Sequence, residues 1–105
     1  MRPWVRALAI VLLLAVPVDG AVTSARIAVT TSPTLISQSG SEIGHALLKN
    51  TGAASVFLGG ADVTTTTGYE FAVGETLSIT LGSNEALYGI VATGTVLVHK
   101  LENRK

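Results

Sequence analysis

Apolar and small polar residues alternate in short bursts through the second half of the chain, and each burst ends at glycine or a turn-forming pair. The clearest burst is Thr76–Leu81, where Leu77, Ile79 and Leu81 alternate with three hydroxyl residues. Alternation with a period of two is typical of a strand that buries one face. We therefore expect these three aliphatic side chains to be buried together and the three hydroxyls to be exposed.

Similar bursts along the chain predict further short strands, and no segment beyond an N-terminal apolar run has helical periodicity. The expected strands are Arg26–Thr30, Thr34–Ser37, Gly44–Asn50, Ala54–Leu58, Phe71–Val73, Thr76–Leu81, Leu87–Ala92 and Thr95–Leu101. Short strands with frequent turn residues indicate a β-sandwich, jelly roll or small barrel. We predict an all-β fold: a single small β-sandwich or jelly-roll-like domain of about seven to eight antiparallel strands over residues 23–105.

Residues 1–22 are predicted to be a hydrophobic leader that resembles a signal peptide. Ala7–Val18 is an apolar run without charge, and Arg2 and Arg6 precede it. A basic start followed by such a run is typical of secretion signals, and the run is shorter than the roughly 20 residues that span a bilayer. The alternative interpretation is that the leader is sequence upstream of the true start. The two interpretations place the protein in different compartments, and neither gives the mature chain a membrane span.

Composition and charge narrow the function classes. The 105 residues include no cysteine, so a small core or oligomerisation must stabilise the domain without disulfides. Seven basic and seven acidic residues balance. No basic stripe with stacking aromatics is present in the sequence, so we expect no nucleic-acid binding. The one local cluster of charge, Lys100–Lys105, is interpreted as a solvated, frayed terminus.

Residues capable of catalysis or metal binding are few and scattered. His45 and His99 lie more than fifty residues apart, each within an expected strand, and Glu42 is the one carboxylate close in sequence to His45. Metal sites and acid–base catalysis need clustered groups. The many hydroxyls lie on strand faces and in turns, where β-propensity explains them. We therefore expect no enzymatic activity, no cofactor and no metal site.

One loop, Gly59–Tyr69, contains more than a strand connection requires. The simple interpretation is a crossover between strands, because its glycines and aspartate favour turns. The functional interpretation is an exposed contact surface, since loops on rigid scaffolds often carry recognition. The candidate interaction residues are Asp62, Thr64, Thr65, Thr66, Thr67 and Tyr69. A second expected turn, Asn50–Gly52, contains residues suited to a left-handed φ.

Several segments together carry a family resemblance that covers almost all of the chain beyond the leader. They are Thr23–Ser37, Asn50–Gly52, Val56–Tyr69 (VFLGGADVTTTTGY), Val73–Gly82 (VGETLSITLG) and Leu87–Val98 (LYGIVATGTVLV). In this order they resemble small all-β proteins of tailed bacteriophages and prophages, which are accessory virion components of the head-decoration or head-fibre type. The hydrophobic leader departs from that pattern, because virion proteins assembled in the cytoplasm do not need one.

The resemblance implies a non-enzymatic structural protein that docks on a capsid or tail lattice, located in the virion or, before assembly, in the host cytoplasm. Strand edges or loop tips are the expected interface, and a homo-oligomer would bury further surface. The alternative is a secreted β-sandwich binding module, for example for glycans, which a true signal peptide would export. Such modules usually present aromatic platforms, and the candidates here are Tyr69 and Tyr88.

Overall fold

The computed structural model describes residues 22–104, and within this range the chain forms strands and no helix. The eight strands are β1 (Val22–Val29), β2 (Thr34–Gln38), β3 (Gly44–Asn50), β4 (Val56–Gly59), β5 (Tyr69–Phe71), β6 (Thr76–Leu81), β7 (Ala86–Ile90) and β8 (Val96–Arg104). The predicted leader, residues 1–22, lies outside the described residues except for Val22, which begins β1.

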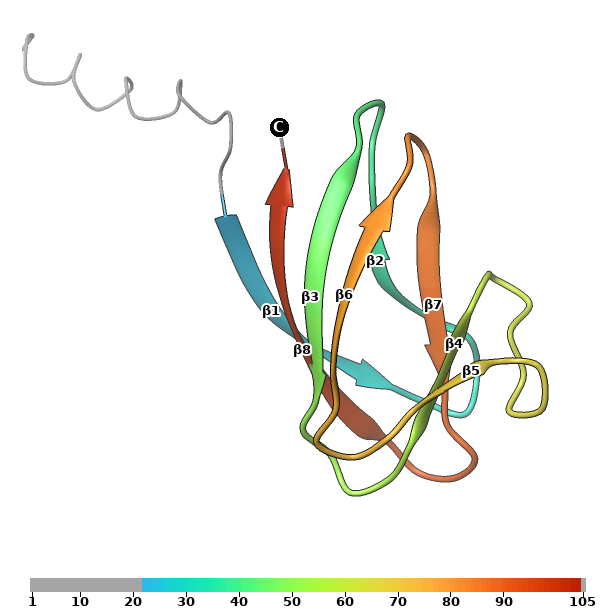
Figure 1. Ribbon diagram of the computed structural model, residues 1–105. Helices are drawn as coiled ribbons and strands as arrows, with labels where there is room; N and C mark the ends of the chain where they lie inside the picture. Colours follow the sequence, from blue (N-terminus) through green and yellow to red (C-terminus); the bar gives the residue numbers. More distant parts are fainter. Residues whose placement is uncertain (1–21, 105) are drawn as a thin grey trace, which may run out of the picture.

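The strands form two four-stranded sheets that face each other (Figure 1). The β1 sheet has the order β1-β8-β3-β6, and the β2 sheet has the order β2-β7-β4-β5. Every strand pair is antiparallel. A two-sheet arrangement in which β1 lies beside β8 and β2 beside β7 is a jelly roll. The predicted all-β class, the strand number and the sandwich architecture are therefore confirmed.

The core lies between the two sheets and consists of aliphatic residues and one phenylalanine. Strand β3 shows the pattern most clearly, because its residues alternate between buried and exposed along its whole length. Fully buried side chains come from both sheets: Val29, Ile36, Leu48, Val56, Phe71, Val91 and Val98. Burying each aliphatic or aromatic side chain of this size contributes about 1.5–3 kcal/mol, so the core supplies most of the favourable free energy.

Strand β6 alternates as predicted, but two of its aliphatic residues are less buried than expected. Leu81 is buried and the three hydroxyls are exposed, whereas Leu77 and Ile79 are half-buried. The reason is the position of β6 at the end of the β1 sheet. The strand at the corresponding end of the β2 sheet, β5, is only three residues long. Leu77 and Ile79 therefore have too little of the opposite sheet above them to be covered.

The prediction of a solvated terminus at Lys100–Lys105 is wrong for its described part. Strand β8 continues to Arg104 because it is an inner strand, paired on one side with β1 and on the other with β3. Lys100 and Glu102 point toward the β2 sheet, and Glu102 is only 5% exposed. The Lys100 ammonium lies 3.0 Å from the Glu102 carboxylate and donates a 2.7 Å hydrogen bond to the carbonyl of Ile36. The hydroxyl of Ser37 also donates to Glu102.

The turn after β3 forms where expected, but for a different reason. Among the described residues a positive φ occurs at Gly74, Asn84 and Gly94, and neither Asn50 nor Gly52 adopts one. Asn50 instead acts through its buried side chain, whose amide donates to two carbonyls and accepts a hydrogen bond from the Gly52 N–H. Glycine is required at position 52 because a Cβ there would lie 2.5 Å from a methyl carbon of Val96.

Candidate functional site

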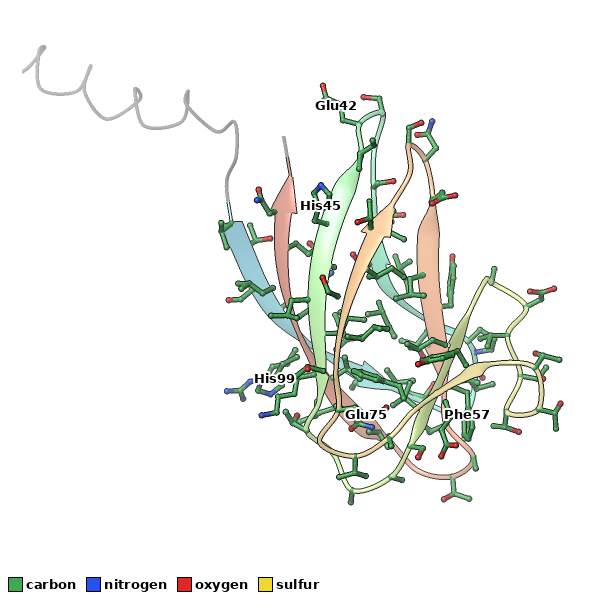
Figure 2. The ribbon with its side chains drawn as sticks, in the orientation of Figure 1. Glu42, His45, Phe57, Glu75 and His99 are labelled. Atoms are coloured by element: carbon green, nitrogen blue, oxygen red, sulfur yellow. The ribbon has the colours of Figure 1, made fainter. Side chains whose placement is uncertain are left out.

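The two histidines lie far apart on the outer face of the β1 sheet. His45 on β3 is opposite Asn103, and His99 on β8 is opposite Lys49, so four residues along β3 separate their positions. That spacing corresponds to about 13 Å along the strand. Figure 2 shows His45 toward one end of the sheet and His99 toward the other. His45 is hydrogen-bonded to the Thr80 hydroxyl at 3.1 Å.

The described residues contain no group of three or more histidine, aspartate or glutamate side chains that could hold a metal ion. The carboxylates that lie in or next to turns are used locally. Glu75 accepts a hydrogen bond from the N–H of Ala72 at 2.7 Å, and Glu85 accepts one from the N–H of Gly82 at 2.6 Å. These carboxylates stabilise the turns that flank β6.

The threonines of the candidate loop are hydrogen-bonded to one another. The loop connects β4 to β5 and projects from the side of the β2 sheet (Figure 1). The Thr64 N–H donates to the Thr67 hydroxyl, and the Thr67 N–H donates to the Thr64 hydroxyl, each at 3.1 Å. The two hydroxyls lie 2.9 Å apart, and the hydroxyl of Thr66 lies 3.1 Å from that of Thr64. These exposed groups therefore hold the loop in one shape.

A buried valine anchors the same loop to the sheet. Val63 is 4% exposed although its neighbours Asp62 and Thr64 are exposed. Glycine at position 68 lets the backbone of the loop lie close to Phe57 and Val63. A Cβ at this position would lie 2.7 Å from the Cβ of Phe57 and 2.9 Å from a methyl carbon of Val63. The loop is thus a fixed part of the scaffold, and its exposed residues are presented at set positions.

Tyr69, the last of the candidate residues, is separated from the threonines by the fold. It begins β5 rather than belonging to the loop, and it is 65% exposed. It lies beside a shallow opening of about 280 Å³ between the end of the β1 sheet and the β2 sheet. We call this opening the open groove; it is lined by Leu58, Gly59, Tyr69, Leu77, Ile79 and Leu87. Apart from the tyrosine hydroxyl, every side chain in this lining is apolar.

The four edge strands differ in how they are protected against pairing with another chain. In the β2 sheet, β2 is irregular between Leu35 and Ser37 and follows Pro33, while β5 has three residues and carries Glu70. Bulges, prolines, charges and short length are the usual devices that prevent edge pairing. The carbonyl of Ile36 at this irregularity accepts a hydrogen bond from Lys100 of β8, which occupies one further backbone group of β2.

The edges of the β1 sheet lack most of these devices. Strand β1 is eight residues long and pairs regularly with β8 over its whole length, and its single charge is Arg26. Strand β6 is six residues long, pairs regularly with β3, and contains no charge and no proline. The sequence pattern identified Leu77 and Ile79 as core residues. It did not identify β6 as an edge strand, because the alternation of apolar and polar residues does not determine the order of strands in a sheet.

Within residues 22–104 no helix is long and apolar enough to cross a membrane.

Comparison with known proteins gives a distant likeness in structure. No protein-family model matches the chain, and no curated protein matches its sequence. Among solved structures, a chain from a study of Bacillus endospore appendages, described there as a family of disulfide-linked pili, superposes with a TM-score of 0.48 at 14% identity. The match covers 82% of this chain and 90% of that chain. A likeness of this size carries no information on function.

Proposed function

We propose that this chain is a non-enzymatic structural subunit that is incorporated into a larger protein assembly through an edge of its β1 sheet. The observation that carries the proposal is the contrast between the two sheets. The β2 sheet has short, bulged or charged edges, whereas the β1 sheet ends in regular strands of eight and six residues. An unprotected edge offers a row of free N–H and C=O groups to another chain.

The resemblance to accessory proteins of bacteriophage virions makes a virion the specific assembly that we propose. A head-decoration or head-fibre protein needs a stable scaffold and a docking edge, and it needs no reactive side chains. The core packed between the two sheets and the loop anchored by Val63 and Gly68 support the first requirement, and the regular edge strands β1 and β6 support the second.

The alternative of a secreted glycan-binding module receives less support from the positions of the aromatic residues. Tyr69 is opposite Leu58, which is itself opposite Gly89, and both of these residues face the core. Tyr88 is the neighbour of Gly89 along β7, so it points to the outer face. The two tyrosines thus point to opposite faces of the β2 sheet and do not form one platform.

The proposal is tested by density-gradient sedimentation of particles from cells that produce the chain together with its natural neighbouring proteins. We expect the chain to sediment with the particles at a fixed number of copies. We also expect Tyr69→Ala to reduce incorporation by about tenfold or more, because an exposed aromatic beside an apolar groove is a typical binding hot spot. Thr93→Ala is the control, since this exposed threonine lies in the turn between β7 and β8, outside the candidate loop and the edge strands.

Both variants should have the circular dichroism spectrum and the midpoint of thermal unfolding of the wild-type protein. Equal incorporation of Tyr69→Ala and Thr93→Ala would show that Tyr69 is not part of the interface. A wild-type chain that stays in the soluble fraction of every gradient would contradict the proposed function and favour the secreted module.

A further inference from the structure

Strand β6 combines a free edge with an uncovered apolar surface. It is the last strand of the β1 sheet, so alternate N–H and C=O groups point away from β3 along its outer edge. Leu77 and Ile79 from the same strand line the open groove together with Leu58, Leu87 and Tyr69. A chain that pairs with β6 would therefore gain backbone hydrogen bonds and would cover apolar side chains at the same time.

The sequence of β6 is complementary to itself in an antiparallel arrangement. When Ile79 lies opposite Ile79 of a second copy, Leu77 lies opposite Leu81, and Ser78 lies opposite Thr80. Every apolar residue of β6 then faces an apolar residue on the core side, and Ser78 faces Thr80 on the outer side, while Thr76 lies opposite Gly82 just beyond the strand. Cross-strand pairs of these kinds stabilise antiparallel sheets.

The charges around β6 do not oppose such pairing. The strand itself contains no charged residue. The two carboxylates that flank it, Glu75 and Glu85, are turned back to the N–H groups of Ala72 and Gly82 in their own turns. The ammonium of Lys100, which points between the sheets, binds the carbonyl of Ile36 on β2 and not β6.

We propose that β6 pairs with β6 of a second copy of this chain around a two-fold axis at Ile79, and that the resulting dimer closes both open grooves. The two β1 sheets become one continuous eight-stranded sheet, and both β1 strands remain as its outer edges. The inference names the partner of the β6 edge, and the biological role of this dimer rests on the proposed function. The dimer itself is tested without particles.

Sedimentation-velocity ultracentrifugation of the purified full chain over a range of concentrations tests the dimer. We expect a monomer–dimer equilibrium for the wild type. Ser78→Lys with Thr80→Lys should weaken the dimer by about 100-fold or more, because the proposed register places the introduced ammonium groups opposite each other. Both positions are exposed in the monomer, so the fold tolerates the change.

Two further double variants make the test specific for this register. Ser78→Lys with Thr80→Glu places opposite charges against each other across the axis, and we expect its dimer affinity to lie within about tenfold of the wild type. Ser24→Lys with Ala28→Lys adds the same charge to exposed positions of the other edge strand, β1, and should leave the dimer unchanged. Circular dichroism checks that each variant is folded.

A wild-type chain that remains monomeric at all concentrations would overturn the dimer, even if the same chain sediments with particles and so supports the proposed function. Loss of association in the β1 variant but not in the lysine variant of β6 would also overturn it, because the contact would then use the β1 edge. Conversely, if the wild type dimerises and the variants behave as expected, the dimer is supported even when the chain is absent from every particle.

Discussion

Asn50→Ala is expected to lower the free energy of unfolding by about 2–4 kcal/mol, since the buried Phe71 carbonyl loses a partner at a cost of about 1–3 kcal/mol and the partly buried groups of Ala54 and Gly52 add smaller losses. Asn50 is fully buried at the end of β3. Its amide donates to the carbonyls of Ala54 and Phe71 at 2.9 Å each and accepts from the N–H of Gly52 at 3.0 Å. One side chain thus connects the turn after β3 to β5, in the other sheet.

Urea unfolding measured by circular dichroism gives this free energy, and Asn103→Ala is the matched control. Asn103 is exposed on the outer face of β8, so its replacement should change stability by no more than about 0.5 kcal/mol. Equal effects of the two replacements would mean that the hydrogen bonds of Asn50 do not hold the sheets together as described.

Lys100→Met is expected to destabilise the protein by about 3 kcal/mol, because it removes the 3.0 Å ion pair with the buried carboxylate of Glu102 and the hydrogen bond to the Ile36 carbonyl. Adding Glu102→Gln in the same chain should recover at least half of this loss, since a neutral amide costs less to bury than a carboxylate that has lost its ion pair with Lys100. The Ser37 hydroxyl can still donate to the amide oxygen. A thermodynamic double-mutant cycle on the four chains measures the coupling.

Lys49→Met serves as the matched control for the lysine replacement. Lys49 is exposed on the outer face of β3, one strand away from Lys100, and it should contribute little to stability. If Lys100→Met and Lys49→Met cost the same, or if Glu102→Gln gives no recovery, then the Lys100–Glu102 pair on β8 does not contribute to stability as described.

Local alternation was enough to predict the strands, but not how far their inward-facing side chains are buried. The pattern of Thr76–Leu81 correctly assigned which residues face inward. Whether Leu77 and Ile79 are covered depends on the position of β6 at the end of its sheet and on the shortness of β5, and both result from pairings between residues distant in sequence. For the same reason, the unprotected edge could not be recognised from the sequence.

Two buried polar groups show a second limit of sequence patterns. Lys100 and Glu102 continue the alternation in which Val96 and Val98 face inward. This alternation in the sequence indicated that β8 extends to the end of the described chain. Their charge suggested a solvated terminus instead. Asn50 was assigned to a turn for its tolerance of left-handed φ, whereas its role depends on carbonyls that only the folded chain brings together.

The candidate loop was predicted correctly as an exposed connection, but its residues divide into two groups. The threonine hydroxyls at positions 64, 66 and 67 are hydrogen-bonded within the loop, while Tyr69 lies at the open groove beside β6. The division arises because β5 begins at Tyr69, whereas the threonines lie in the loop between the buried Val63 and Gly68.

Hydrogen exchange of the edge-strand amides, measured by mass spectrometry in the free chain diluted until it is monomeric and in the assembly that contains it, tests most directly whether this protein assembles through its β1 sheet. Edge amides that become paired are protected from exchange. We expect the amides of β6, or of both β6 and β1, to exchange more slowly in the assembly, while those of β2 and β5 keep their free rates. Equal rates for β1 and β6 in both states would contradict assembly through this sheet.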